Sequence, residues 1–408
     1  MSHDHDSASI LPFAPPTRRL MGPGPSDVHP RVLAAMARPT IGHLDPTFVE
    51  MMEELKELLR YAFQTRNDVT FPVSGPGSVG METCFVNLVE PGETVVVCRN
   101  GVFGGRMLEN VRRIGGTAVV VDDEWGAPVS PDKVEAALRE HPEATVVAFV
   151  QAETSTGAHT APQPLVALAH EHDCLTIVDA VTAVGGCPVA TDEWDIDAVY
   201  TGTQKCLSCP PGLAPVSFNE RALGKIRDRK TPCQSWFMDL SLQLGYWSSG
   251  PRTYHHTAPI NALYGLHEAL LMVREEGLER AWERHRRNHR ALAAGVDAMG
   301  LSLFVEERHC LPQLNMVVIP DGIDDGAARS QLLDEFDVEI GGGLGALAGR
   351  IWRVGLMGYA SREDNVIAFL QALEAVLARQ GQAAAPGRGE AAARRVFDDS
   401  AGGSPAAG

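Results

Sequence analysis

Lys205 and Asp179 are the residues whose types and positions point most directly to chemistry. Lys205 follows an apolar run at 198–202, and Asp179 ends another at 174–179, so both stand where a buried strand is expected to end. A lysine amine can hold an aldehyde as a Schiff base, and a carboxylate can keep a pyridine nitrogen protonated so that the ring withdraws electrons. The pair therefore predicts an enzyme that uses pyridoxal 5'-phosphate (PLP).

A glycine-bearing turn is a candidate for binding the phosphate of that cofactor. Gly75, Gly77 and Ser78 lie between an apolar run at 68–73 and a helix-like stretch that follows. Glycines let backbone N–H groups approach a phosphate, and a helix N-terminus favours its negative charge. No Lys-Ser or Lys-Thr pair follows, so the turn is not a nucleotide-binding P-loop. Purely structural turns of this kind are common, and the assignment depends on the lysine.

Four further side chains are candidates for the same site, and each has a structural alternative. Phe103 would stack on a cofactor ring or fill a core. Thr154 would bond the cofactor's phenolic oxygen or belong to an ordinary turn. Gln204 would bond the phosphate or the backbone. Arg353, which follows a glycine-rich loop, would bind a carboxylate bidentately or form a surface ion pair.

The elements that must position these residues alternate between strand-like and helix-like segments up to about residue 259. This alternation predicts an α/β fold with a mostly parallel, seven-stranded sheet covered by helices on both faces. Ligands of such sheets bind outside the carboxyl ends of the strands, where Asp179 and Lys205 are expected. The seven candidate strands cover residues 68–73, 93–99, 117–121, 145–151, 174–179, 198–202 and 214–218.

Beyond residue 262 the pattern changes to long helices, short strands and a helix at 362–379 capped by Ser361, which predicts a smaller α+β domain. The end of the chain is of low complexity and is expected to be disordered. The predicted organisation is an N-terminal arm at 1–20, a large PLP-binding domain at 21–265, a small C-terminal domain at 266–380 and a disordered tail at 381–408.

Composition bounds the function. A chain of 408 residues suggests two domains, and 44% hydrophobic with 21% charged residues is typical of a globular protein. The net charge of −17 argues against a nucleic-acid or membrane partner. The N-terminal residues lack the pattern of a signal peptide, so a cytoplasmic location is expected. The cysteines are expected to be buried thiols, with no metal site, because the single CxxC at 206–209 has no second ligand pair.

Taken together, these segments resemble the class V aminotransferases, and within them the alanine–glyoxylate / serine–pyruvate (serine–glyoxylate) aminotransferase family. The resemblance runs from residue 21 to the helix after Arg353 and omits only the arm and the tail. The motifs that carry it are Gly22-Pro23-Gly24-Pro25-Ser26, Glu153-Thr154-Ser155-Thr156-Gly157, Val178-Asp179-Ala180-Val181, Gly202-Thr203-Gln204-Lys205, Pro210-Pro211-Gly212, Tyr254-His255-His256-Thr257 and Trp352-Arg353-Val354-Gly355.

The resemblance implies PLP-dependent transferase fold type I, with PLP held in active sites shared across a homodimer. It places Lys205 at the Schiff-base position and Asp179 at the ring nitrogen. Proline at 76 has neither a hydroxyl nor an N–H group, which puts one phosphate contact of the family in doubt. The other positions that the resemblance assigns are ring stacking for Phe103, a hydroxyl for Thr154, the phosphate for Gly77, Ser78 and Gln204, the partner subunit's phosphate for Tyr254 and Thr257, and the substrate for Arg353, Gly24 and His43.

The implied reaction moves the amino group of alanine or serine to glyoxylate or pyruvate, with Lys205 carrying the proton from Cα. Ureidoglycine–glyoxylate aminotransferases are the nearest alternative. They typically have Gln where this chain has His43 and Asn where it has Tyr254, which favours alanine or serine. An aspartate–glyoxylate aminotransferase or a PLP lyase is less favoured. A cysteine desulfurase would need a cysteine in the loop before Arg353, and a non-catalytic relative would have lost Lys205, so neither fits this sequence.

Overall fold

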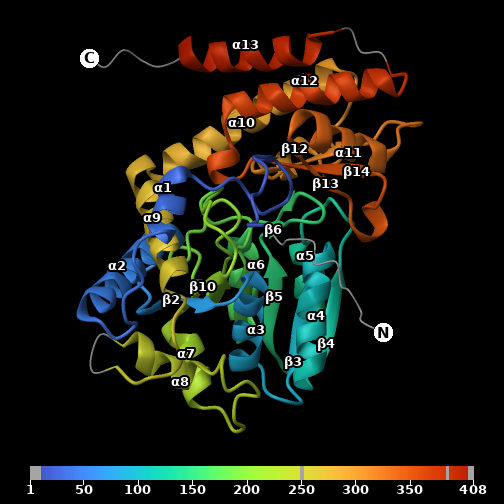
Figure 1. Ribbon diagram of the computed structural model, residues 1–408. Coiled ribbons are helices and arrows are strands. Elements are labelled where there is room, and N and C mark those ends of the chain that lie inside the picture. The colour runs from blue at the N-terminus through green and yellow to red at the C-terminus, as the bar shows by residue number, and fades with distance from the viewer. Residues whose placement is uncertain (1–10, 249–251, 383–385, 403–408) are drawn as a thin grey trace, which may run out of the picture.

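The computed structural model describes residues 11–248, 252–382 and 386–402. Its largest element is a seven-stranded sheet (Figure 1). β10 runs antiparallel to both of its neighbours, and the other neighbouring strands are parallel, which confirms the predicted mostly parallel sheet. The strands, in spatial order, are β2 (Val69–Ser74), β10 (Leu213–Phe218), β9 (Ala198–Tyr200), β8 (Leu175–Asp179), β5 (Ala144–Val150), β3 (Thr94–Arg99) and β4 (Thr117–Asp122).

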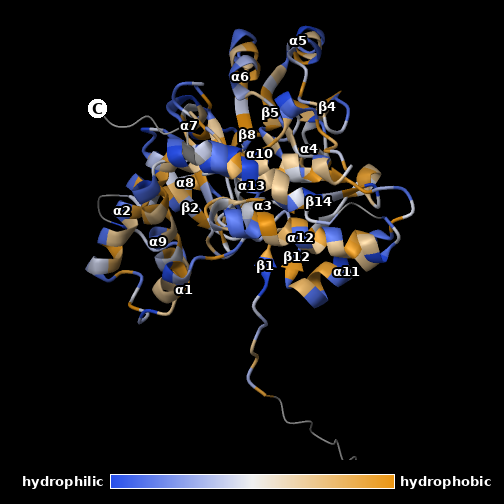
Figure 2. Cartoon of the chain, turned by 90° about the horizontal axis from the view of Figure 1, so that it is seen from above, coloured by the Kyte–Doolittle hydropathy of each residue, from blue (hydrophilic) through white to orange (hydrophobic). Residues whose placement is uncertain are grey.

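Helices cover both faces of this sheet. α3 (Gly77–Leu88) and α4 (Val102–Ile114) contact each other and the sheet, and so do α5 (Pro131–Glu140) and α6 (Pro162–Glu171). Right-handed crossovers place the first pair and the second pair on opposite faces. Figure 2 shows the strands between these pairs. Because both faces are covered, the inner strands are runs of buried Val and Ala with no polar alternation.

A second group of helices packs around the β2 side of the sheet and leads to the C-terminal part. α2 contacts β2, while both α1 and α2 contact α9, and α7 contacts α3 and α8. α9 and α10 are the long helices that the sequence predicts near and beyond residue 262. These helices are α1 (Pro30–Met36), α2 (Pro46–Phe63), α7 (Glu220–Arg227), α8 (Leu240–Trp247), α9 (Ile260–Glu276) and α10 (Leu278–Ala298).

The C-terminal part has its own hydrophobic cluster, separate from that of the large sheet. Buried residues of α9 belong to the cluster of the large sheet, so the predicted boundary between residues 265 and 266 lies inside one helix. The C-terminal part contains two small sheets and several helices. Its elements include the three-stranded sheet β11 (Leu314–Val318), β14 (Ile351–Gly355) and β13 (Gly341–Gly342), the pair β1 (Arg19–Leu20) and β12 (Val338–Glu339), and the helices α10, α11 (Asp325–Phe336) and α12 (Glu363–Arg379).

Two sequence-based expectations about the C-terminal part are wrong. The stretch expected to be a disordered tail contains α13 (Arg388–Gly402), which packs on α10 and α12 and buries Ala393 and Phe397. The apolar residues of α13 lie on one face, but the surrounding sequence is of low complexity, so the helical pattern was not recognised. The second concerns Ser361, because the N-cap of α12 is Arg362 and the Ser361 hydroxyl accepts a hydrogen bond from Asn288. Residues 1–10, 383–385 and 403–408 of the predicted arm and tail lie outside the described residues.

None of the helices in the described part of the chain is long and apolar enough to cross a membrane.

Candidate active site

The predicted catalytic residues meet at the carboxyl ends of the central strands. Asp179 is the last residue of β8 and pairs in register with Val150 of β5 and Tyr200 of β9. Lys205 follows β9, and Thr154 follows β6 (Ala152–Glu153), which pairs with β7 (Ala158–His159). Since parallel strands end at the same edge of a sheet, one edge carries all of these side chains.

Asp179 is a buried carboxylate whose two oxygens are held in place. Oδ1 accepts a hydrogen bond from the Val181 backbone N–H at 2.9 Å, and Oδ2 accepts one from the Tyr200 hydroxyl at 2.8 Å. Burial raises the pKa of Asp179 to about 6, against the opposing effects of these bonds and of the Lys205 cation. An orientated carboxylate with little access to water is suited to pairing with a buried cationic N–H group.

Lys205 is also buried, with 8% of its surface exposed. Its Nζ donates a hydrogen bond to the Pro23 carbonyl oxygen, and a Cβ built on Gly24 would lie 2.5 Å from Nζ. The Ser26 hydroxyl donates to the Lys205 carbonyl oxygen at 2.7 Å. Burial, and after it the charge of Arg353, lowers the pKa of the Lys205 amine to about 8. The segment 22–26 therefore holds a lysine that loses its proton easily.

Arg353 brings a cation from the small sheet to this edge. It stands in β14 opposite Met316 and Gly341, and it is 8% exposed. Nε donates to the Gly342 carbonyl at 2.7 Å and Nη1 to the Thr154 carbonyl at 3.5 Å. Burial lowers the pKa of Arg353 to about 10, so it stays charged at neutral pH. Its other N–H groups have no partner within the described residues and can bind a carboxylate.

The predicted phosphate-binding turn opens α3 at Gly77. Pro76 is the N-cap, and no side chain caps this helix end. A Cβ on Gly202 would lie 3.4 Å from the Gly77 Cα, so the backbones of these two glycines approach each other closely with no side chain between them. The Gln204 Oε1 is buried without a hydrogen-bond partner in the described chain. Uncapped backbone N–H groups at the start of a helix form a place for an anion. Ser78 is exposed at this helix end.

Phe103 is positioned by a buried acid whose role the sequence did not reveal. The Glu153 Oε2 accepts from the backbone N–H groups of Phe103 and Gly104 at 3.2 and 3.4 Å, and the Ser155 hydroxyl accepts from Val102 at 2.9 Å. Glu153 and Ser155 thus take the place of a side-chain N-cap for α4, whose own N-cap is Gly101. Burial raises the pKa of Glu153.

Thr154 lies in the same turn, and its hydroxyl is 2.6 Å from that of Thr182. Tyr200, Glu153, Ser155, Thr182 and Ser26 were not assigned a role from the sequence. Each acts through a partner distant in sequence. The available signal was only that polar residues stand at the ends of buried strands.

His43, Tyr254 and Thr257 are not in contact with Lys205 within the chain. The His43 Nδ1 is 3.1 Å from the Tyr246 hydroxyl, and its ring packs edge-on against Tyr254 with centroids 5.6 Å apart. Tyr254 is 67% exposed, and Thr257 is exposed as well. Within the described chain, His43 therefore interacts with Tyr246 and Tyr254 instead of Lys205.

The residues at the sheet edge fit PLP, on the chemistry of their donor groups. A buried amine of lowered pKa suits its aldehyde, a buried carboxylate suits its ring nitrogen, and the uncapped N-terminus of α3 suits its phosphate. Among the described residues there is no cluster of His, Cys, Asp and Glu that could hold a metal ion.

Comparisons with known proteins agree with this geometry. The family model described as Aminotransferase class-V matches residues 26–364. The (S)-ureidoglycine–glyoxylate transaminase of Bacillus subtilis (strain 168) is 40% identical over 94% of this chain and 96% of its own length. The alanine–glyoxylate aminotransferase of Mus musculus is 38% identical over 90% of this chain and 89% of its own. The crystal structure of an alanine–glyoxylate aminotransferase from Nostoc sp. superimposes with a TM-score of 0.89 at 43% identity, covering 92% of this chain and all of that one.

Proposed function

The chain belongs to the class V aminotransferase family and is an aminotransferase, and from this premise we propose that it uses PLP, held by Lys205, to move the amino group of alanine or serine to glyoxylate or pyruvate. The observation that carries the proposal is that Lys205, Asp179 and Arg353 converge, buried, at one sheet edge. An amine, an acid and a carboxylate-binding cation are the three groups that amino transfer on an amino acid requires.

Each of the three has a distinct role. When bound, PLP supplies a ring that withdraws negative charge from the substrate Cα. Arg353 binds the substrate carboxylate and so fixes the orientation of the Cα–H bond. The Lys205 Nζ would take the proton from the substrate Cα and deliver it to the carbon on the other side of the transferred nitrogen. Asp179 pairs with the ring nitrogen, and its bonds to Val181 and Tyr200 keep it orientated.

The donor is proposed to be a small amino acid. Gly24 stands against the Lys205 side chain with its backbone at φ +110°, a region that favours glycine. The segment 22–26 therefore approaches the lysine closely and leaves little room beside it. Ureidoglycine is the second candidate, favoured by the 40% identity to the Bacillus subtilis transaminase. His43 and Tyr254 stand where glutamine and asparagine are typical of that group, which favours alanine or serine.

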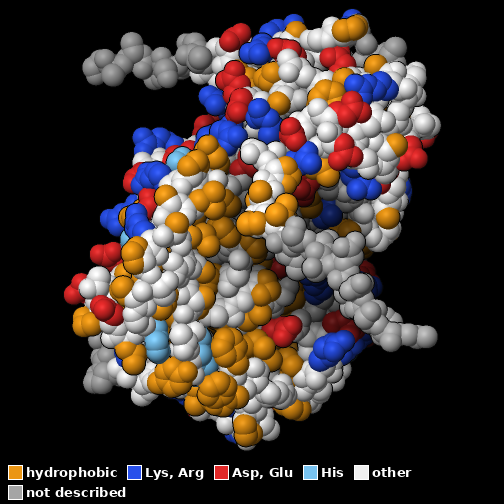
Figure 3. Space-filling model, in the orientation of Figure 1, with side chains coloured by type: hydrophobic (Ala, Val, Ile, Leu, Met, Phe, Trp, Pro, Cys, Tyr) orange, Lys and Arg blue, Asp and Glu red, His pale blue; other side chains and the backbone are white. Residues whose placement is uncertain are grey.

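A homodimer with shared active sites would give Tyr254, Thr257 and His43 a function. Tyr254 and Thr257 are exposed, and large apolar side chains are also exposed at Leu33, Leu44, Trp236 and Leu242. Hydrophobic side chains gather over the large domain on the face drawn in Figure 3. An apolar face of this kind is typical of a permanent subunit interface. Sedimentation of the PLP-loaded protein tests it, with a monomer as the contradicting result.

The proposed role of Lys205 has a direct chemical test. Borohydride reduction of the PLP-loaded protein, followed by digestion and mass spectrometry, should place the cofactor on the peptide that contains Lys205. Lys205→Ala should neither retain the label nor transfer an amino group from alanine to glyoxylate. Lys56→Ala is the matched control, because Lys56 is also a buried lysine, at 6% exposed, but lies on α2. Label on another lysine would contradict the proposal.

A further inference from the structure

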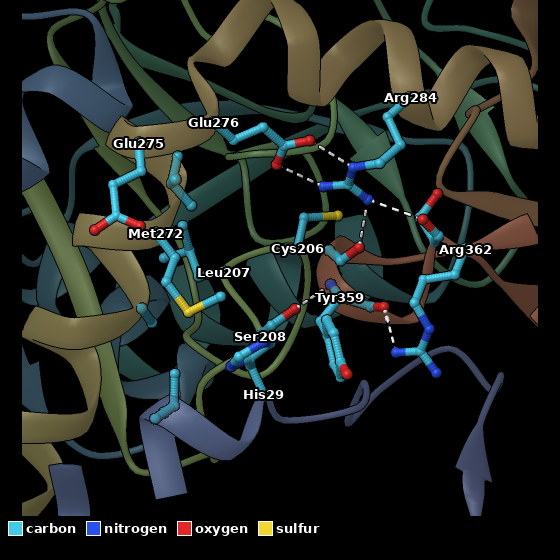
Figure 4. Close-up of a pocket in the computed structure, with 15 residues that line it drawn as sticks. His29, Cys206, Leu207, Ser208, Met272, Glu275, Glu276, Arg284, Tyr359 and Arg362 are labelled. Atoms are coloured by element: carbon cyan, nitrogen blue, oxygen red, sulfur yellow. Dashed lines mark hydrogen bonds and ion pairs between the residues drawn. The ribbon is translucent and has the colours of Figure 1, made fainter. Parts of the chain in front are cut away.

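The turn that follows Lys205 is supported from the side opposite its amine. Whereas Nζ reaches toward Pro23, the next residues, Cys206 to Ser208, line a cavity of about 480 Å³ between α1, α9, α10 and residues 358–362 (Figure 4). Tyr359 and Arg284 line the same cavity. The C-terminal part therefore contacts the residues adjacent to the catalytic lysine.

Ser208 is held in an uncommon backbone conformation. Its φ is +52°, in the left-handed region that non-glycine residues adopt rarely and that persists only where surrounding contacts enforce it. Its N–H donates to the Lys205 carbonyl at 3.0 Å, which closes a turn from the lysine. Its hydroxyl accepts from the backbone N–H of Tyr359 at 2.7 Å. A bond from the C-terminal part thus fixes the turn that begins at Lys205.

The residues around Tyr359 are held by α10 in turn. The N–H of Gly358 donates to the His285 Nε2 at 2.9 Å, and the opposite ring nitrogen, Nδ1, is 2.6 Å from the Ala281 carbonyl. Because Nε2 accepts a hydrogen bond, the proton must be on Nδ1 and the imidazole is neutral. Burial lowers the pKa of His285 to about 3, in agreement with a neutral ring at all physiological pH values.

Arg284 holds the carbonyl groups of the same turn. Nη1 donates to the carbonyls of Gly358 and Ser361 at 2.7 and 3.0 Å, and the other guanidinium nitrogens pair with Glu276 (Figure 4). Neighbouring side chains of α10 therefore satisfy both the donor and the acceptors of this turn. These hydrogen bonds restrict the positions that the turn can adopt.

The turn is also continuous with the strand that carries Arg353. β14 ends at Gly355, and Gly358 follows after two buried residues. A Cβ on Gly358 would collide with the Ser208 hydroxyl and the Cys206 carbonyl, so the two segments are in close contact. The stretch from 351 to 361 therefore holds the carboxylate-binding arginine at one end and supports the lysine turn at the other.

We propose that His285 is a positioning residue that, through Gly358 and Ser208, sets the place of Lys205 relative to Arg353. The proposal rests on the proposed roles of those two residues in amino transfer. His285 touches neither substrate nor cofactor. It acts by accepting the hydrogen bond that the Gly358 N–H donates, and loss of that acceptor lets the lysine turn move relative to the arginine.

The test compares three variants of the full, PLP-loaded chain. His285→Leu removes the acceptor, whereas His285→Gln keeps an amide oxygen that can accept from Gly358. His289→Leu is the matched control, because His289 lies one turn further along α10 and bonds Asn315 instead of the turn. For His285→Leu, kcat should fall by about 10-fold or more while KM for the amino acid changes by less than about 3-fold. His285→Gln should restore most of kcat, and His289→Leu should resemble the wild type.

A spectroscopic measurement separates positioning from a general loss of structure. The visible absorbance of bound PLP changes with pH. The pH at the midpoint of this change depends on the surroundings of the lysine nitrogen. Looser packing gives that nitrogen more water and should raise the midpoint by about one unit in His285→Leu, but not in His289→Leu. Ser208→Ala breaks the same link from the lysine side and should raise it too, and it serves if His285→Leu does not fold.

The proposal is overturned if the midpoint and kcat of the folded His285→Leu or Ser208→Ala protein equal those of the wild type, or if His289→Leu shifts them as much. A wild-type protein that fails to transfer an amino group would instead contradict the proposed function, so the two failures are distinguishable.

Discussion

At Lys205, burial and the charge of Arg353 together lower the pKa of the amine to about 8, while burial raises that of Asp179 to about 6. The pKa values of the two groups therefore approach pH 7 from opposite sides. Shifts of this kind are typical of residues that exchange protons in an active site. Arg353 stays charged at neutral pH, whereas the charge of Lys205 depends on pH in the neutral range.

The rate at which the cofactor-free chain captures PLP should rise with the fraction of Lys205 that has lost its proton. Only the neutral amine attacks the aldehyde, so the capture rate should rise about tenfold per pH unit below 8 and level off above it. Stopped-flow absorbance across about pH 6 to about pH 10, values chosen to bracket this pKa, measures that rate. A rate that keeps rising toward pH 10.5, the ordinary pKa of lysine, would show that Lys205 is exposed to water.

At the scale of elements, the site depends on two parts that contribute different groups. The large sheet contributes Lys205 and Asp179 from strand ends, while the small sheet contributes Arg353 from β14. The hydrogen bond from the Tyr359 N–H to the Ser208 hydroxyl connects the parts directly, and α10 holds the turn that contains Tyr359. Because α10 also packs on α12 and α13, the terminal helices stabilise the element that supports the lysine turn.

Truncation of Phe397 in α13 should therefore destabilise the C-terminal part. Phe397 is 5% exposed, and Arg287 of α10 lies over its ring. Phe397→Ala should lower the free energy of unfolding by about 3 kcal/mol, a usual cost of emptying a buried phenylalanine site. Arg395→Ala, at an exposed position of the same helix, is the matched control and should change it by less than about 0.5 kcal/mol. Equal denaturant midpoints for both variants would show that α13 does not pack as described.

Sequence patterns were sufficient for elements whose residues are uniform in character. The strand runs of Val and Ala were identified to within a residue or two, and Pro131 at the first position fixed the start of α5. α13 was missed because its alanines and charged residues resemble a polar, low-complexity stretch until α10 and α12 cover its apolar face.

The same limit applies to the site. Lys205 and Asp179 were predictable because ionisable residues at the ends of buried strands are unusual, whereas Arg353, which lies within β14, was assigned through the family resemblance. The bonds from Tyr200, Glu153 and His285 were not predictable, because they depend on distances between segments far apart in the chain. The residues proposed to contact the cofactor or substrate were thus identifiable from the sequence, whereas the residues that orientate them were not.

At the scale of the whole molecule, the proposed reacting groups of the aminotransferase lie at one sheet edge, and Tyr254 and Thr257, the residues proposed to serve a second subunit, are exposed. The net charge of −17 repels anionic substrates in general, so binding of a small carboxylate depends on the local cation at Arg353. The central claim is that this site passes an amino group from a small amino acid to a small 2-keto acid.

The most direct measurement is a half-reaction of the PLP-loaded protein with one amino donor at a time, followed by absorbance. Alanine or serine alone should abolish the visible band of the bound cofactor, with one equivalent of keto acid released per site, and glyoxylate should then restore the band and yield glycine. Ureidoglycine and aspartate, tested in the same way, should act more slowly. A band that no amino acid abolishes, or one that glyoxylate and pyruvate do not restore, would contradict the claim.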